Sequence, residues 1–287
     1  MSMVDLPLAP RPVSALRIFA RNRSAALAGL VLAALLLVAL AAPLLAPYAP
    51  GAIGVGPAMV GPDAAHLFGT DELGRDVLSR VLYGLRISLL VGFGAAGIAT
   101  ALGIVMGGIA GFSGGLVDDL LMRVTEVFQV IPRFFLAVVL VAFFGASIWN
   151  IIGAIAILSW PDIARLVRAE FLTLRTRQFV DAARVAGAPA GVLIFGEILP
   201  NALAPVVVNG TLMVGQAMLL EAGLSYLGLG DPSQVSLGLI LQEAQQIMRR
   251  AWWTTAFPGI AIFLAVLSLN VVGDGLNDVL NPRSRER

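Results

Sequence analysis

Few side chains in this 287-residue chain could carry out covalent chemistry. The chain has no cysteine, a single histidine (His66), and arginine at all 19 basic positions, so lysine is absent as well. Without lysine it can form neither a Walker A phosphate loop nor a Schiff base, and without cysteine it has no thiolate ligand or nucleophile. One loop histidine cannot assemble a catalytic triad or a metal site. The sequence therefore predicts no catalytic residue and no metal site, and another chain must bind any ATP.

The most informative segment reads RQFVDAARVAGAPAGVLIFGEILP and covers residues 177–200. Residues 178–186 are predicted to form a helix on which three alanines make a small-residue face. Gly187 lies where a left-handed cap would end this helix, and Pro189 lies where a second helix could begin. Such a projecting hairpin could dock into a groove of another protein. The pattern alone fits a helix on the lipid surface equally well.

Membrane-spanning helices are the elements that must position this segment. The chain is 58% hydrophobic and 13% charged, whereas a soluble domain carries about 25% charged residues. Its mean hydropathy is +0.89. A bilayer is the natural solvent for so much apolar surface. The net charge of +1 gives no indication of nucleic-acid binding.

Six apolar stretches predict an all-α polytopic membrane protein. The first, Ala25–Leu45, is too long for the apolar core of a cleaved signal peptide, so we expect it to be retained as a span. The second contains Gly103, Gly107 and Gly111, whose four-residue spacing predicts close packing against another helix. The expected spans are about 25–45, 87–112, 120–145, 148–166, 198–220 and 256–272, with long polar loops at 47–80 and 221–255.

The arginines predict the orientation of these spans. They gather in three segments: Arg11, Arg17, Arg21 and Arg23 before the first span; Arg165, Arg168, Arg175, Arg177 and Arg184 between spans four and five; and Arg283, Arg285 and Arg287 in the tail. With six spans these segments share one side, which the positive-inside rule makes cytoplasmic. Arg249 and Arg250 fall outside and depart from this rule. We expect a cytoplasmic N-terminal segment at 1–24 and a six-span transmembrane domain at 25–287, with a cytoplasmic loop at about 169–196.

A charged stripe lies within the third apolar stretch. Arg123, Glu126 and Arg133 follow helical spacing, and Arg133 would lie about 20 Å along a helix that begins near Leu120. A charge at that depth costs about 2.5–3.5 kcal/mol on insertion scales and usually faces a cavity or a partner. Two interpretations stay open. Arg133 pairs with Glu126 and stabilises the bundle, or the stripe lines a pathway and Arg133 meets an anionic group of the solute.

An Asp-Ala-Ala triplet, a glycine and a Leu-Pro pair stand at a characteristic spacing within residues 177–200. This pattern resembles the "EAA" loop of binding-protein-dependent ABC permeases, in which the loop forms a coupling helix that sits in a cleft of the ATPase subunit. Asp181 replaces the family's usual glutamate and is one methylene shorter. By this resemblance the ATPase-coupling residues are Asp181, Ala182, Ala183, Gly187, Ala188, Leu199 and Pro200.

Residues 68–80, 221–230 and 270–282 resemble segments of the dipeptide, oligopeptide and nickel "C-type" permeases, so the resemblance covers about Arg17 to Arg283. It implies one of two homologous permease subunits that enclose a pathway in the bacterial inner membrane. The implied partners are two cytoplasmic ATP-binding subunits and an external solute-binding protein. ATP and Mg²⁺ would be bound by the partners, and this chain would hold no cofactor. Dipeptides, oligopeptides, nickel chelates, opines and glutathione all stay open as the solute.

Two other classes of protein fit less well. An ion-coupled secondary transporter needs intramembrane acidic residues as ion sites and often consists of two similar halves. Acidic residues are few in the apolar stretches, and the long loops follow spans one, four and five. An intramembrane serine hydrolase needs a histidine within a span, yet Ser159 and Ser268 lie in apolar stretches while His66 lies in a loop. We therefore expect a permease subunit rather than an enzyme.

Overall fold

The computed structural model describes residues 19–280, and regular structure in this range is helical apart from one isolated β-bridge between Thr70 and Asp76. Most of the predicted segment 1–24 and the three C-terminal arginines lie outside the described residues. The elements are α2 (Arg23–Leu40), α3 (Ala42–Leu45), α4 (Val77–Ser113), α5 (Gly115–Val130), α6 (Arg133–Phe144), α7 (Ile148–Leu174), α8 (Gln178–Val185), α9 (Ala190–Val192), the π-helix η1 (Leu193–Ile198), α10 (Leu199–Leu224), the π-helix η2 (Ser225–Leu229), α11 (Leu237–Ala244) and α12 (Trp253–Leu280).

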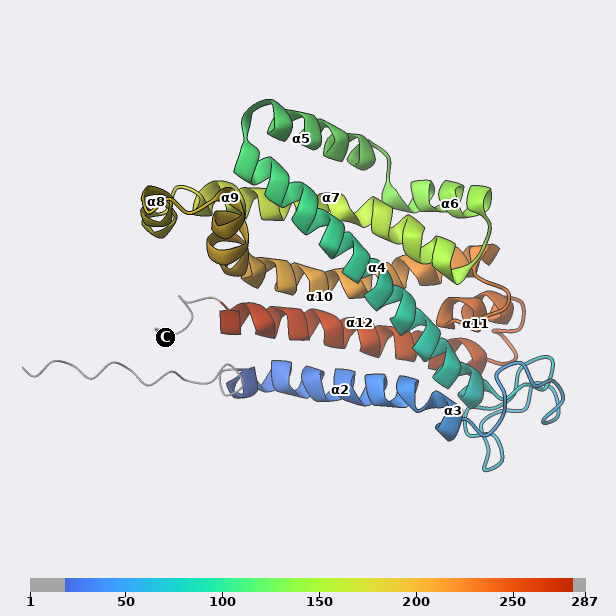
Figure 1. The fold of residues 1–287 in the computed structure, drawn as a ribbon. Helices are drawn as coiled ribbons and strands as arrows, with labels where there is room; N and C mark the ends of the chain where they lie inside the picture. The colour runs from blue at the N-terminus through green and yellow to red at the C-terminus, as the bar shows by residue number, and fades with distance from the viewer. Residues whose placement is uncertain (1–18, 281–287) are drawn as a thin grey trace, which may run out of the picture.

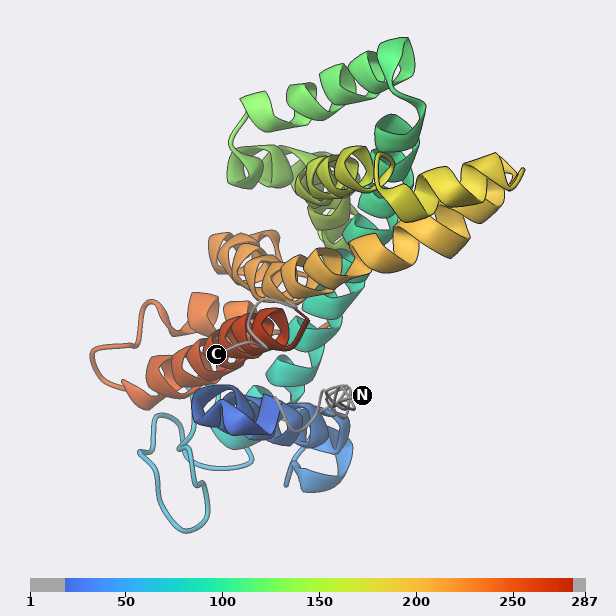
Figure 2. The ribbon, with the colours of Figure 1, turned by 90° about the vertical axis from the view of Figure 1, so that its left-hand side faces the viewer.

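The long helices form one layer with α4 lying across it. Across the layer the order is α5 and α6, α7, α10, α12 and α2, and α4 packs against α7, α10, α12 and α2 in turn (Figure 2). Helix α8 projects at one end of the layer, which we call the α8 end (Figure 1). The loop before α4, together with α3 and α11, lies at the opposite end, which we call the α11 end.

The chain crosses between these two ends six times. Five described helical segments are long and apolar enough to span a membrane, or six if the bent pair α5–α6 counts as one. Helices α4 and α7 both run from the α11 end to the α8 end, so α5 and α6 carry the chain back between them (Figure 1). The start of α2 and the end of α12 meet at the α8 end, where Asn22 Nδ2 donates to Asp278 Oδ2 at 3.1 Å. The predicted six-span, all-α architecture is confirmed.

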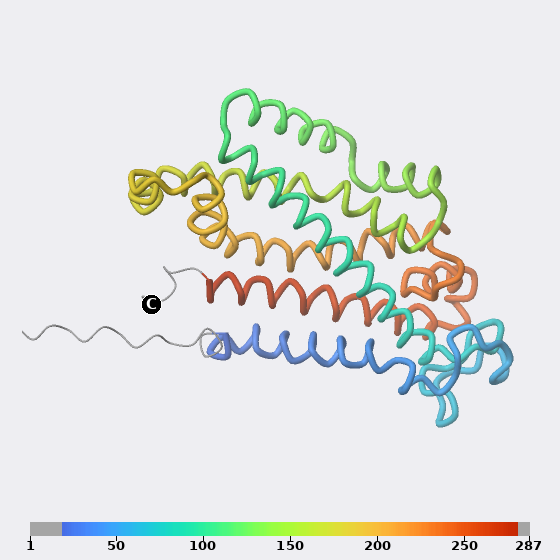
Figure 3. Tube along the Cα trace, viewed as in Figure 1, coloured from blue at the N-terminus to red at the C-terminus, as the bar shows by residue number. Residues whose placement is uncertain are grey.

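The third predicted span is wrong as a continuous helix. Helix α5 ends at Val130, and α6 begins at Arg133 after a bend of 86°. Pro132 causes the break, because proline lacks an N–H and forces the preceding residue out of the helical region. Ile131 accordingly has φ −97° and ψ 134°. Figure 3 shows the chain passing between the two helices at this point.

Several predicted boundaries are also wrong, chiefly where charged residues were taken to lie in loops. Helix α4 begins at Val77, ten residues before the expected 87. Helix α7 continues through Pro161 to Leu174 and so includes the first part of the predicted loop at 169–196. Arg165 and Arg168, counted among the arginines between spans four and five, therefore lie within α7. The predicted loop at 221–255 contains the end of α10, η2 and α11. Charged residues inside these helices have partners elsewhere in the fold, as when Arg168 Nη2 of α7 donates to Asp118 Oδ2 of α5 at 2.7 Å.

The glycine stripe of α4 lies against α7, which confirms the close packing against another helix that its spacing predicts. A Cβ atom at Gly103 would lie 2.5 Å from Ile163 Cβ, and one at Gly107 would lie 2.2 Å from the carbonyl oxygen of Ala164. A Cβ atom at Gly111 would lie 2.6 Å from Phe171 Cβ. The two backbones therefore approach more closely than any residue with a side chain would allow.

We predict that Gly107→Val destabilises the protein by about 1–3 kcal/mol, because overpacking forces α4 and α7 apart. Gly97→Val is the matched control: it makes the same change in the same helix, where a Cβ atom meets nothing within 4 Å. Thermal unfolding of the purified variants in detergent measures the difference. Equal melting temperatures for the two variants would show that the glycine stripe does not set this contact.

Candidate functional site

A glycine cap closes helix α8. Gly187 has a φ of +86°, in the left-handed region that favours glycine. The N–H of Gly187 donates to the carbonyl oxygen of Arg184 at 3.0 Å, and the N–H of Ala188 donates to that of Ala183 at 3.0 Å. Together these two bonds form a Schellman motif, which satisfies carbonyl groups at the end of the helix. The predicted cap at Gly187 is confirmed.

One buried side chain anchors α8 to the rest of the protein. Val180 is 0% exposed and shares a hydrophobic cluster with Leu193 and Ile198 of η1. The element after the cap, α9, runs through η1 into α10 without a loop. The predicted short helix, turn and second helix are therefore present, and they form a hairpin whose tip projects from the α8 end (Figure 1).

The predicted coupling residues fall into two places. Asp181, Ala182, Ala183, Gly187 and Ala188 lie together at the tip of the hairpin, where Ala183 and Ala188 are half-buried and the other three are exposed. Leu199 and Pro200 lie instead at the start of α10, beyond the π-helix.

The Asp181 carboxylate accepts a hydrogen bond from Arg184 Nη1 at 2.8 Å, and both side chains are more than half exposed. An exposed pair of this kind contributes little to stability.

The sequence reading missed one apolar residue on this tip. Val185 is 89% exposed and lies three residues after Ala182, so the two side chains share a face of α8. Ala186 is exposed as well and continues that face. The sequence feature that could have identified Val185 is its apolar side chain in a charged segment, three residues, or about one helical turn, after Ala182. We call the exposed surface of Ala182, Val185 and Ala186 the α8 patch.

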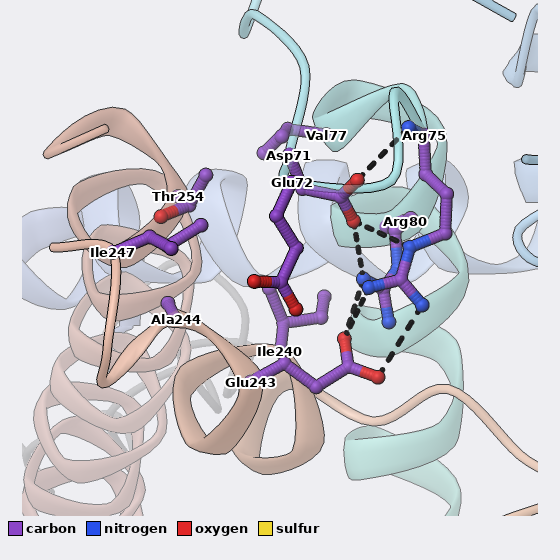
Figure 4. Close-up of a pocket in the computed structure, with 10 residues that line it drawn as sticks. All are labelled: Asp71, Glu72, Arg75, Val77, Arg80, Ile240, Glu243, Ala244, Ile247 and Thr254. Atoms are coloured by element: carbon purple, nitrogen blue, oxygen red, sulfur yellow. Dashed lines mark hydrogen bonds and ion pairs between the residues drawn. The ribbon is translucent and has the colours of Figure 1, made fainter. Parts of the chain in front are cut away.

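A network of four charged residues ties together the elements at the α11 end (Figure 4). Arg80 Nη1 lies 2.9 Å from Asp71 Oδ2 and 2.6 Å from Glu243 Oε2. Arg75 Nη2 lies 2.9 Å from Glu243 Oε2. Because Arg80 is only 3% exposed, its charge needs this pairing to be tolerated. The network joins the loop before α4 to α11 and leaves the carboxylate of Glu72 exposed at its edge.

Two carboxylates fix the connection between α10 and α11. Glu221 is 2% exposed and accepts hydrogen bonds from Ser225 Oγ at 2.7 Å and from Ser88 Oγ of α4 at 3.0 Å. Asp231 accepts a hydrogen bond from the N–H of Ile148 at 2.9 Å. Burial alone would raise the pKa of Asp231, but hydrogen bonds from Ser233 and Ile148 outweigh burial and hold the pKa below its ordinary value.

Arg133 pairs with Asp162 of α7, so the interpretation in which it pairs with Glu126 is wrong. Glu126 Oε2 instead lies 3.4 Å from Arg123 Nη1, and both of these side chains are exposed. The helix break explains the difference, because Glu126 and Arg133 lie on two helices bent by 86° and no longer share a stripe. Asp162 also accepts hydrogen bonds from Gln129 at 3.1 Å and from Arg165 at 3.3 Å.

No group of three or more His, Cys, Asp or Glu side chains within residues 19–280 is arranged to hold a metal ion.

Known proteins resemble this chain over most of its length. Residues 103–286 match the family "Binding-protein-dependent transport system inner membrane component", and residues 13–61 match "N-terminal TM domain of oligopeptide transport permease C". The dipeptide transport system permease protein DppC of Alkalihalophilus pseudofirmus is 43% identical, covering 78% of this chain and 74% of its own. DppC of Haemophilus influenzae is 37% identical, covering 99% of this chain and 100% of its own.

A chain in the inward-facing structure of the MetNI methionine ABC transporter has a similar fold. The TM-score is 0.54 at 21% sequence identity, and the alignment covers 71% of this chain and 96% of that one. At this identity the likeness establishes the fold alone.

We predict that Gly187→Ala loosens the end of α8, because a left-handed conformation costs a residue with a side chain about 1–2 kcal/mol. Gly191→Ala is the matched control, since a Cβ atom meets nothing within 4 Å at either position and only Gly187 has a positive φ. Hydrogen exchange of the Gly187 and Ala188 amides measures the effect, which should be about tenfold faster exchange in the first variant. Equal exchange rates of these amides in the two variants would show that the left-handed conformation at residue 187 does not require glycine.

Proposed function

Because the chain belongs to the binding-protein-dependent transport system inner membrane component family, we propose that it forms half of the translocation pathway of an ATP-driven importer for peptides. The chain is a multi-pass permease subunit of an ABC transporter. It works in an assembly with other transporter subunits. Peptides are its proposed solute because relatives at 37–43% identity are dipeptide or di/tripeptide permeases.

The observation that carries the coupling role is the projecting hairpin with its exposed α8 patch. A valine that is 89% exposed at the tip of a helix is an apolar surface with no cover in the monomer. In the proposed complex an ATP-binding subunit covers it, and ATP and Mg²⁺ are bound on two such subunits. The predicted coupling residues at the hairpin tip, Ala182 and Ala183 among them, surround this contact.

The hairpin is built to pass movement to a membrane span. Val180 packs with Leu193 and Ile198, and η1 continues directly into α10. When the ATP-binding subunits close, a rigid displacement of α8 therefore moves the start of α10 with it. In this mechanism the chain supplies no chemical step, and the free energy comes from ATP bound by the partners.

The second permease subunit and the external binding protein occupy other surfaces. We place the α8 end in the cytoplasm, because Arg175, Arg177 and Arg184 lie there together with the start of α2. The α11 end then faces the outside of the inner membrane, where the binding protein delivers the solute. The ion-coupled secondary transporter considered as an alternative receives no support from the family match.

We predict that Val185→Arg disrupts docking of the ATP-binding subunit. Burying a valine side chain is worth about 1.5–3 kcal/mol, so its loss should weaken the complex about tenfold or more. Leu67→Arg is the matched control, because Leu67 is also an exposed apolar residue but lies in the loop at the α11 end. Co-purification with the ATP-binding subunit measures the effect. Equal recovery with both variants would exclude the α8 patch as the docking surface.

The orientation is tested by reporter fusions. Fusions at Gly56 and Gln234 should report the outside, and a fusion at Arg177 should report the cytoplasm, because the arginine-rich segments are retained inside. Alkaline phosphatase activity, paired with a fluorescent protein at the same sites, measures each location. A cytoplasmic Gly56 would reverse the proposed orientation.

A further inference from the structure

A charged cluster lies within the helices that span the membrane. Asp162 accepts hydrogen bonds from Gln129 and Arg133 across the α5–α6 break and from Arg165 on its own helix. With a rise of 1.5 Å per residue, Asp162 is about 21 Å from the start of α7 and about 18 Å from its end. A hydrocarbon core is about 30 Å thick, and a 27-residue helix that crosses it extends beyond it by about 10 Å in total, so Asp162 lies within the core when α7 spans it.

The cluster has a net charge of +1. Two arginines share the single carboxylate of Asp162. Arg133 is the better enclosed of the two, whereas the side chain of Arg165 is 56% exposed and its contact with Asp162 is long, at 3.3 Å. A guanidinium has five N–H donors, and most of those on Arg165 are therefore available to another group.

The exposed side of the cluster faces away from α4. Ala164 and Val167 of α7 lie against Gly107 of α4. Asp162 and Arg165 each come two residues before one of these, which places them about 200° around the helix. Arg165, whose side chain is exposed, thus lies away from the α4 side of the helix layer.

The neighbouring helix α10 shows the same pattern. Val214 of α10 lies against Gly92 of α4, and Gln216 comes two residues later, again about 200° around the helix. Asn209 comes seven residues, or about two turns, before Gln216 and so shares its face. Both side chains are exposed. Exposed amides and a guanidinium are costly against lipid, so this shared face borders water or another protein rather than acyl chains.

We propose that Arg165 forms a carboxylate-binding subsite in the transport pathway, where it receives a carboxylate of the passing peptide. This inference rests on the proposed function, because two permease subunits enclose a pathway and the face away from α4 is the one left open for it. A guanidinium binds a carboxylate through two parallel hydrogen bonds, which suits the free C-terminus of a peptide.

Asp162 sets the strength of this subsite. It neutralises Arg133 and leaves one net positive charge for the solute. A pair of unopposed arginines would hold a carboxylate too firmly to release it, and conduction requires a site that binds weakly enough for the solute to leave. Asp162 is thus a positioning residue, and Arg165 is the residue that touches the solute.

Transport by the complete transporter in proteoliposomes tests this role. The probes are radiolabelled dialanine and dialanine amide, which differ only in the C-terminal carboxylate, taken up with ATP and the binding protein present. The ratio of variant to wild-type uptake is measured for each probe, because this ratio cancels any preference of the binding protein. Arg165→Gln should lower uptake of dialanine about tenfold and leave that of the amide near wild type. Arg165→Lys should retain most of the dialanine uptake, since it keeps the charge.

Arg123→Gln is the matched control, because Arg123 is an exposed arginine of α5 with only a 3.4 Å contact to Glu126. It should transport both probes as the wild type does. An equal loss of both probes in Arg165→Gln, or no loss of either, overturns the subsite.

A second measurement does not depend on the solute. Because the chain has no cysteine, Arg165→Cys introduces a single thiol whose reaction with a charged, water-soluble methanethiosulfonate reports access to water. In the assembled transporter Cys at 165 should react, whereas Leu27→Cys, on the exposed apolar side of α2, should not. An unreactive thiol at 165 overturns the proposal.

The two measurements separate failure of this inference from failure of the proposed function. If the wild type takes up neither dipeptide, the proposed solute is wrong, and thiol reactivity still decides whether Arg165 borders the pathway. If the wild type takes up dialanine while the thiol is unreactive, the transporter function stands and the subsite is wrong.

Discussion

The fold depends on the backbone contact between α4 and α7. Glycine at 103, 107 and 111 removes the side chains that would hold the two helices apart, and the carbonyl oxygen of Ala164 lies only 2.2 Å from where a Cβ atom of Gly107 would be. Between helices in lipid, where the hydrophobic effect is absent, such close packing is a main source of association. Beyond the glycines, Arg175 Nη1 donates to the carbonyl oxygen of Gly111 at 3.0 Å and so helps to satisfy the end of α4. The contact therefore fixes both the position of α7 in the layer and the point at which the chain leaves for α8.

The placement of charge follows from that contact. Once one side of α7 is committed to α4, Asp162 and Arg165 lie away from that contact, and Gln129 and Arg133 of the α5–α6 pair meet Asp162 there. The break at Pro132 makes this possible, because a straight third span would carry Arg133 along the stripe of Glu126. A bend of 86° turns Arg133 toward α7 instead. The break at Pro132 thus allows Arg133 to form an ion pair with Asp162.

Features that depend on residues close together in the sequence were predicted correctly. The lengths of the apolar stretches predicted six spans, the four-residue glycine spacing predicted close packing of α4 against another helix, and Gly187 predicted the end of α8. The predictions that were wrong mostly took charged residues as a sign of loops. Residues such as Arg80 and Glu221 suggested loops, but each is buried because its partners come from distant parts of the chain, Glu243 and Ser88. No one-dimensional pattern contains such pairings. The predicted pairing of Arg133 with Glu126 is wrong for a related reason. Pro132 was treated as a residue within one continuous helix, whereas it separates α5, which carries Glu126, from α6, which carries Arg133.

The two halves of the proposed mechanism meet at α10. Its first turn continues from η1, so it receives any displacement of α8, and its exposed face bears the amides of Asn209 and Gln216. A π-helix at that junction has a wider turn and poorer packing than an α-helix, and π-bulges are frequent at functional sites. Pro205, about two turns further along, lacks the N–H for one backbone hydrogen bond of α10. The start of α10 is therefore less regular than the middle of this span, which is held between α4 and α12. A displacement of α8 therefore changes α10 mainly at its α8 end. That end lies on the same face away from α4 and in the same half of the layer as Arg165.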